Sequence, residues 1–257
     1  LRSPHLAPPL SVPVAPPLPT ALSPVLPAPL PASLPAALSA VVHQVGTLGG
    51  VETSLVEPGH FGASTDSISI LEDFVTPQDL EHMSAFLPTI SEWDNPRETE
   101  YDETGVCIYD ASYWWDRMCS GPIIQRINPF VYQMIEKYID KMQRHLEAKH
   151  NVTLTCRPPV LVRWLPGCEQ SPHADKQLND GNPNPFPTYD LNSIIYWNED
   201  FTGGQFHYPG YDIELPIKSG LAVAHPGDVH YLHGVKPVEF FNDTATTEIY
   251  TITSLGD

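Results

Sequence analysis

Histidine and carboxylate side chains gather at two places in the second half of the chain. His173-Ala-Asp175 follows the Pro166-Gly167 turn, and its histidine and aspartate, two residues apart, share one face of an extended segment. A later segment, His225-Pro-Gly-Asp-Val-His230-Tyr-Leu-His233, supplies three more histidines. Two histidines and one carboxylate can bind one face of an iron(II) ion and leave the opposite positions open. An H-x-D triplet alone equally suits a surface turn, so its surroundings must decide.

Short apolar runs around these segments predict the strands that would carry them. Turn residues separate the runs, among them Gly203-Gly204 and Pro209-Gly210. The predicted strands lie at 160–165, 192–197, 204–208, 212–215 and 220–225, with an earlier one at 67–71. Residues 91–120 show no clear period and are expected to be irregular.

Two helices are expected before most of these strands. Thr76 suits an N-cap with Pro77 in the first turn, and this helix should end near Leu87. Asn128-Pro129 repeats the signal and opens a second helix. Its apolar stripe comprises Phe130, Val131, Met134, Ile135, Tyr138, Ile139, Met142 and Leu146. Helices followed by many short strands predict an α+β, mainly β fold, with a sheet sandwich or jelly roll backed by helices.

Composition divides the chain into unlike pieces. Of the 29 prolines, 12 precede Ala36, and Arg2 is the only charged residue before Glu52, so residues 1–66 are expected to be disordered or polyproline II. The net charge of −18 makes a nucleic-acid partner improbable. No apolar run reaches 18 residues and no clear signal peptide is present, so we expect a soluble chain of unknown compartment. Four cysteines without a C-x-x-C pair predict free thiols.

The segments around the histidines follow one another in a distinctive order. The order runs Leu161-Val-Arg-Trp-Leu-Pro-Gly, His173-Ala-Asp175, Ser193-Ile-Ile-Tyr-Trp-Asn, Asp200-Phe-Thr-Gly-Gly, Leu215-Pro-Ile-Lys-Ser-Gly and His233-Gly-Val-Lys-Pro-Val. Over residues 155–238 it resembles the iron(II)/2-oxoglutarate-dependent dioxygenases of the prolyl 4-hydroxylase type. The resemblance implies a double-stranded β-helix (jelly-roll) fold. It also implies an oxidoreductase that uses iron(II), 2-oxoglutarate and O₂, with L-ascorbate as a helper that keeps the iron reduced.

The resemblance also implies roles for individual residues. His173, Asp175 and His233 would be the catalytic iron ligands. His233 is chosen over His225 and His230 because only His233 is followed by Gly and then Val-x-Pro-Val, and the other two would be polar residues on a nearby loop. Tyr196 would hydrogen-bond the far carboxylate of 2-oxoglutarate, with a packed sheet tyrosine as the alternative. Trp164 replaces a tyrosine of the family and is expected to form a wall of the cosubstrate pocket. Residues 93–119 and 176–190 are the expected substrate loops.

The last residues depart from the family pattern. After Val238 the family has a glycine and then a Lys or Arg that pairs with 2-oxoglutarate, whereas Phe241 and Asp243 stand here. Residues 242–251 also match the translation of AATGATACGGCGACCACCGAGATCTACAC, a common sequencing-library adapter. We therefore expect residues 240–257 to be a non-native tail and the 67–239 dioxygenase domain to lack its last strand and its cation. The alternative is a divergent native strand, in which case Lys218, Arg163 or Lys236 would have to supply the cation.

Three functions stay open on these grounds. The first is a 2-oxoglutarate- and O₂-dependent hydroxylase acting on a protein, peptide or small molecule, with peptidyl proline suggested by the family. The second is a jelly-roll binding module without turnover, as the present C-terminus would predict. The third is a cupin-like metal enzyme that does not use 2-oxoglutarate.

Overall fold

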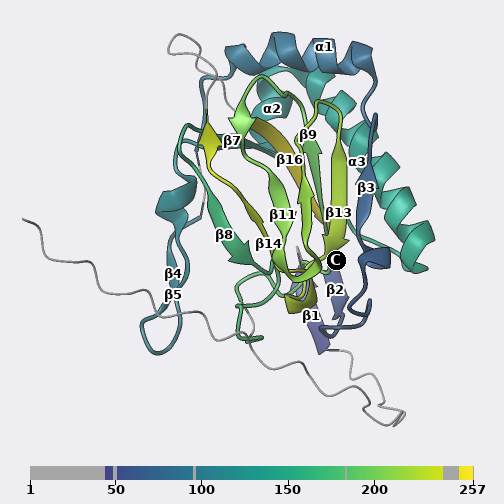
Figure 1. Ribbon diagram of the computed structural model, residues 1–257, viewed down its shortest axis with the longest axis vertical. Coiled ribbons are helices and arrows are strands. Elements are labelled where there is room, and N and C mark those ends of the chain that lie inside the picture. Colours follow the sequence, from purple (N-terminus) through teal and green to yellow (C-terminus); the bar gives the residue numbers. More distant parts are fainter. Residues whose placement is uncertain (1–43, 49–50, 95–96, 183, 240–248, 257) are drawn as a thin grey trace, which may run out of the picture. The chain divides into compact units, whose positions relative to one another are not determined.

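The computed structural model describes residues 44–48, 51–94, 97–182, 184–239 and 249–256 (Figure 1). All of them belong to one compact unit, Val41–Asp257. The disorder predicted for residues 1–43 lies outside the described residues. Within the remainder of the Pro-rich piece, β1 (Gln44–Leu48) pairs with β2 (Val51–Leu55), and a 3-10 turn spans Thr65–Ser67.

Two antiparallel sheets form the body of the fold (Figure 1). The larger has the order β3 (Ser69–Leu71), β13 (Ala222–Pro226), β9 (Leu191–Tyr196), β16 (Ile249–Gly256), β7 (Val160–Trp164) and β6 (Met118–Ser120). The smaller has the order β12 (Ile213–Leu215), β11 (Phe206–Tyr208), β14 (His233–Val235) and β8 (Gln170–His173). Two short pairs are added, β4 (Glu100–Tyr101) with β5 (Cys107–Tyr109) and β10 (Thr202–Gly203) with β15 (Val238–Glu239). The predicted mainly β fold with few helices is confirmed.

In the described ranges, three α-helices accompany the sheets: α1 (Pro77–Phe86), α2 (Gly121–Ile127) and α3 (Pro129–His150). The predicted caps are confirmed, since the Thr76 side chain accepts a hydrogen bond from the Asp79 amide and Asn128 accepts one from Val131. The apolar stripe of α3 is buried except for Phe130, which is 57% exposed. The prediction for Phe130 is wrong, because this residue lies in the first turn and its ring stays at the surface beside His82.

Alternating side chains of the larger sheet pack into two separate cores. Leu161, Ile195, Ala222 and Ala224 face the core that contains the buried stripe of α3. Their neighbours Val162, Tyr196 and Val223 face a second core, which they share with Phe206, Tyr208 and Val235 of the smaller sheet. The helices therefore cover one face of the larger sheet, and the smaller sheet covers the other.

The C-terminal strand corrects one expectation. We predicted that the sheet lacks its last strand, but β16 lies between β9 and β7 and pairs with both. The strand-like residues at 249–256 thus occupy the interior of the larger sheet. The origin of residues 240–257 stays a prediction, and Phe241 and Asp243 lie outside the described residues.

Two smaller sequence predictions are also resolved. All four cysteines are free thiols, as predicted. No helix in the described part of the chain combines the length and the apolar character needed to cross a membrane.

Candidate metal centre

The three residues predicted as ligands meet at one end of the smaller sheet. His173 ends β8 and His233 begins β14, and the two are direct partners in the antiparallel register. Paired residues of neighbouring strands place their side chains on the same face, and the two imidazole rings lie 4.5 Å apart, centroid to centroid. Asp175 follows two residues after β8, where its amide donates to the Gly227 carbonyl at 2.9 Å.

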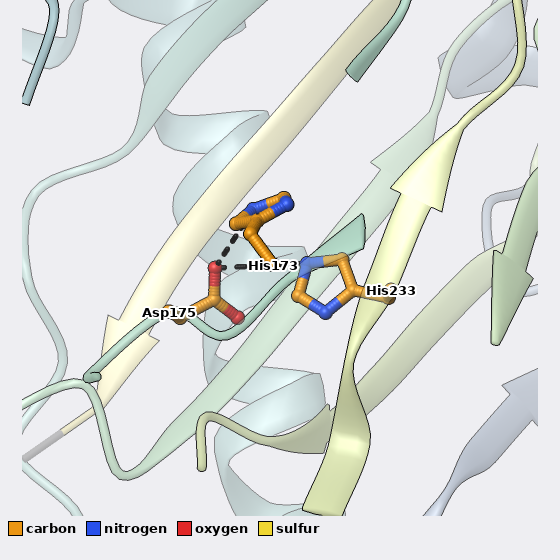
Figure 2. A group of neighbouring side chains, drawn as sticks. All are labelled: His173, Asp175 and His233. Atoms are coloured by element: carbon orange, nitrogen blue, oxygen red, sulfur yellow. Dashed lines mark ion pairs between the residues drawn. The ribbon is translucent and has the colours of Figure 1, made fainter. Parts of the chain in front are cut away.

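One carboxylate oxygen of Asp175 faces both histidines (Figure 2). Asp175 Oδ1 lies 3.7 Å from His173 Nε2 and 3.6 Å from His233 Nε2. One nitrogen or oxygen from each of the three side chains lies within 4.8 Å of the others. Three donor atoms at this spacing surround a position that a single metal ion could take.

Backbone carbonyls determine which ring nitrogen of each histidine is available. His173 Nδ1 lies 3.0 Å from the Ser171 carbonyl, and His233 Nδ1 lies 3.0 Å from the Tyr231 carbonyl. A carbonyl only accepts, so each Nδ1 carries the proton and each Nε2 presents a lone pair toward Asp175. The Gln170 side-chain amide, 3.1 Å from His173 Nε2, is a donor suited to that lone pair.

Burial keeps the inner histidine neutral. It lowers the pKa of His233 to about 4, in spite of the opposing effect of Asp175. A metal binds neutral imidazole, so His233 needs to lose no proton near neutral pH. The His233 side chain is only 5% exposed and that of His173 is 30% exposed, so the site opens on the His173 side.

The donor set fits the ion that the resemblance implies. Two neutral imidazole nitrogens and one carboxylate oxygen form the facial arrangement of non-haem iron(II) sites, which leaves positions for other ligands. The Nε2 lone pairs of both histidines are directed toward Oδ1, and the Gln170 amide is the present partner of the one on His173. The residues present therefore fit an iron(II) ion.

A cavity of about 950 Å³ opens from these three residues. Tyr196 and Trp164, the two predicted cosubstrate residues, both line it. Both are buried, and burial raises the pKa of Tyr196 far above its usual value, so its hydroxyl stays protonated and able to donate. The cavity thus contains the candidate ligands and both predicted cosubstrate contacts.

The two predicted substrate loops also contribute to the cavity wall. From residues 93–119 come Arg97, Tyr109, Tyr113 and Trp114, and from residues 176–190 come Gln177, Asn184, Phe186 and Tyr189. The second loop folds back on the centre, since Asn184 Nδ2 donates to the Asp175 carbonyl at 2.7 Å. A buried ion pair between Lys176 and Asp190 joins the two ends of that loop.

The cations proposed as partners of 2-oxoglutarate lie elsewhere. Lys218 Nζ is 4.0 Å from Glu72, Lys236 pairs with Glu214, and Arg163 donates to the Asp116 carbonyl. None of the three lines the cavity among the residues described. Among the described residues that line the cavity, the Lys or Arg is Arg97, which we did not predict from the sequence. Its guanidinium lies 4.1 Å from the Phe186 ring centroid and pairs with Glu100.

The two other histidines of the late segment have different places. His230 lies in the 3-10 helix η5 (Val229–Tyr231) and is not among the grouped donor atoms. His225 was expected on a loop, which is wrong: it lies in β13, is 1% exposed, and its Nε2 is 3.3 Å from Asp175 Oδ2. Burial lowers its pKa well below the usual value, with His233 and His173 adding to the effect.

Comparison with known proteins supports the fold. No family model matches the sequence, and no curated protein matches it. The 2OG complex of the viral collagen prolyl hydroxylase vCPH from Paramecium Bursaria Chlorella virus-1 aligns with a TM-score of 0.50 and 13% identity, over 74% of this chain and 95% of that chain. At this identity the similarity shows a shared, jelly-roll-like fold.

Two further prolyl hydroxylases align less well. One from Trichoplax adhaerens, in complex with a hypoxia inducible factor oxygen degradation domain peptide, has a TM-score of 0.48 and 16% identity over 75% of this chain and 84% of that chain. A Pseudomonas putida prolyl-4-hydroxylase has a TM-score of 0.48 and 14% identity over 74% and 91%.

Proposed function

We propose that this chain is a hydroxylase that uses non-haem iron(II), 2-oxoglutarate and O₂. The observation that supports it best is the convergence of His173 Nε2, His233 Nε2 and Asp175 Oδ1 in the lining of the cavity. The proposal includes a double-stranded β-helix core and a dioxygenase domain at residues 67–239, with β16 (Ile249–Gly256) completing its larger sheet. It also assigns His173, Asp175 and His233 as the iron ligands.

The overall reaction consumes one 2-oxoglutarate and one O₂ for each hydroxylated substrate. One oxygen atom enters a substrate C–H bond as hydroxyl, the other enters succinate, and the lost carboxylate leaves as CO₂. Bound iron(II) supplies the O₂ activation that this chemistry needs. The chain itself holds both Nε2 lone pairs in place through Nδ1 and provides the enclosing cavity.

Tyr196 and Trp164 are proposed to hold the cosubstrate. The Tyr196 hydroxyl stays protonated and could donate to a carboxylate in the same cavity, and the Trp164 indole forms an apolar wall beside it. L-ascorbate is proposed as the reductant that maintains iron(II). The aromatic rim from Tyr109, Tyr113, Trp114 and Phe186 suits a peptide substrate, and peptidyl proline is the first to test.

The scarcity of cations in the described cavity lining favours a second candidate, a metal enzyme that does not use 2-oxoglutarate. Arg97 is the Lys or Arg in the described cavity lining, and it already pairs with Glu100. A dicarboxylate cosubstrate needs a partner for its distal carboxylate. The two candidates differ in one property, since only the first binds 2-oxoglutarate at the metal.

Succinate release tests the first proposal. The purified chain is incubated in air with iron(II), ascorbate, 2-oxoglutarate and a Pro-rich peptide, and succinate is measured by mass spectrometry. We expect turnover in the parent chain and in His230→Ala, whose side chain lies outside the donor group, and none in His173→Ala or Asp175→Ala. Equal turnover in all four proteins would overturn the ligand assignment, and no turnover in any would contradict the hydroxylase.

A further inference from the structure

The end of β13 and the turn after it lie against Asp175. The Gly227 carbonyl accepts hydrogen bonds from the amides of Asp175 at 2.9 Å and Lys176 at 3.0 Å. Two residues earlier, His225 Nε2 lies 3.3 Å from Asp175 Oδ2, the oxygen that does not face the candidate ligand histidines. The end of β13 and the turn that follows it thus contact Asp175 at both its side chain and its backbone.

The two oxygens of Asp175 have different surroundings. Oδ1 faces His173 and His233, whereas Oδ2 faces His225 and accepts a hydrogen bond from the Asn192 side-chain amide. His225 and Asn192 are direct partners across β13 and β9, so their side chains extend from the same face of the larger sheet. The sheet therefore presents two nitrogens to one carboxylate oxygen.

The Tyr208 hydroxyl and the Asp175 carboxylate lie at the two ring nitrogens of His225. The hydroxyl lies 2.7 Å from His225 Nδ1, and both side chains are buried. A carboxylate only accepts, so the contact of Nε2 with Asp175 Oδ2 favours the tautomer that carries its proton on Nε2. In that tautomer Nδ1 accepts from the Tyr208 hydroxyl, which keeps its proton because burial raises the pKa of Tyr208 well above its usual value.

Within the part of the chain that the structure describes, the Nε2 atom of His225 has no other hydrogen-bond partner. It is buried and unpaired apart from its ion-pair-range contact with Asp175 Oδ2. An unsatisfied buried donor is destabilising, so a small rotation of the carboxylate that completes this hydrogen bond would be favourable. Such a hydrogen bond would leave Oδ1 as the free oxygen.

We propose that the His225-Pro226-Gly227 segment, which runs from the end of β13 into the following turn, acts together with Tyr208 as a positioning device that selects Oδ1 of Asp175 as the metal-binding oxygen. His225 is a positioning residue, acting through Asp175 and not by ligation. The inference rests on the proposed function only in taking the His173, Asp175 and His233 group as a metal site. It requires neither 2-oxoglutarate nor turnover.

Cobalt(II) binding tests this inference without turnover. Affinity is measured from the visible absorption of Co²⁺ in the full chain and in three variants. Loss of a partner that orients a ligand weakens metal affinity by about 10- to 100-fold. We expect that loss in His225→Phe, with the shape of the absorption band retained because the ligands are unchanged. We expect a smaller loss in Tyr208→Phe and a change of less than about twofold in the control His230→Gln.

A double variant separates positioning from a general packing effect. Because Tyr208 acts through His225, the pair His225→Phe/Tyr208→Phe should bind Co²⁺ no more weakly than His225→Phe alone. Additive losses would overturn the relay. Unchanged affinity in His225→Phe would overturn the positioning role, as would a changed band shape, which would make His225 a ligand.

Folding and the proposed function are tested separately. Circular dichroism without metal checks each variant, and if His225→Phe does not fold, Tyr208→Phe tests the inference by itself, since it removes one hydroxyl. Failure of the parent chain to bind Co²⁺ would overturn both proposals. Tight binding by the parent with no effect of His225→Phe or Tyr208→Phe would overturn the positioning role alone.

Discussion

Two Pro-Gly turns of this chain offer a matched test of how the centre is held. A Cβ at Gly227 would lie 1.9 Å from the Tyr189 carbonyl oxygen and 2.9 Å from Asn192 Nδ2, whereas a Cβ at Gly210 would meet nothing within 4 Å. An ordinary contact begins near 3.4 Å, so Gly227→Ala demands a shift of about 1.5 Å. Gly210→Ala demands none.

Little at Gly227 can move without loss. Its amide donates to the Asp190 carbonyl at 3.0 Å, and its carbonyl accepts from Asp175 and Lys176. The cost of Gly227→Ala in folding stability is either the loss of these three hydrogen bonds, at about 1 kcal/mol each, or an equivalent overpacking strain of about 1–3 kcal/mol. We expect Gly227→Ala to lower the free energy of unfolding by about 3 kcal/mol, and to lower Tm by about 6–12 °C in a chain of this size.

Urea and thermal unfolding of the metal-free chain measure both variants. Gly210→Ala should stay within about 0.5 kcal/mol of the parent, since the new methyl group meets open space. Gly227→Ala should lose stability and, with Asp175 displaced, affinity for Co²⁺. If the two alanine variants have the same free energy of unfolding, the close packing of the His225-Pro226-Gly227 segment against the loop before β9 is refuted.

Three further predictions concern other parts of the molecule. Tyr138→Phe should lower the free energy of unfolding by about 1–3 kcal/mol in urea titration, because the hydroxyl accepts from the Thr76 amide at 2.9 Å and that amide would become unsatisfied; an unchanged midpoint contradicts this. Burial lowers the pKa of His150 to about 4, so the folded chain loses stability as the pH falls from about 6.5 through 4. Between pH 7 and 4.5 the free energy of unfolding of the parent should fall by about 1 kcal/mol more than that of His150→Gln, a value reduced for the partial exposure of this histidine. Parallel pH profiles of the two proteins contradict this. Tyr196→Phe should raise the KM for 2-oxoglutarate about 10- to 100-fold, and an unchanged KM would make this tyrosine a packing residue.

Local signals in the sequence predicted much of the fold. Proline-marked caps placed α1 and α3, and the alternating apolar runs placed β7, β9, β11, β12 and β13, because caps and periodicity act within a few residues. The strand that ends in His173 could not be found this way. Gln170-Ser-Pro-His173 has no apolar alternation and contains a proline, and it is a strand only because β14 pairs with it from 60 residues further along the chain.

The neighbours of the candidate centre were also hidden from local reasoning. Arg97 and Asn192 are polar residues with no distinctive spacing, and long-range packing brings them to the cavity and to Asp175. Gln170 contacts His173 only three residues away, but the strand β8 that holds the two residues in place was not predicted. For His225 a signal did exist. His225 lies two residues after Val223 in β13, so the two side chains point to the same face of the strand. Val223 faces the smaller sheet, so the alternation predicts that His225 faces the candidate ligands.

An anaerobic titration tests the central claim most directly. Iron(II) is added to the full chain with and without 2-oxoglutarate, and the visible absorption is recorded before any O₂ is admitted. We expect iron binding in both cases, and a weak visible charge-transfer band only with 2-oxoglutarate, lost in Asp175→Ala. Iron binding without the band would favour the metal enzyme that does not use 2-oxoglutarate. No iron binding at all would contradict the metal centre formed by His173, Asp175 and His233.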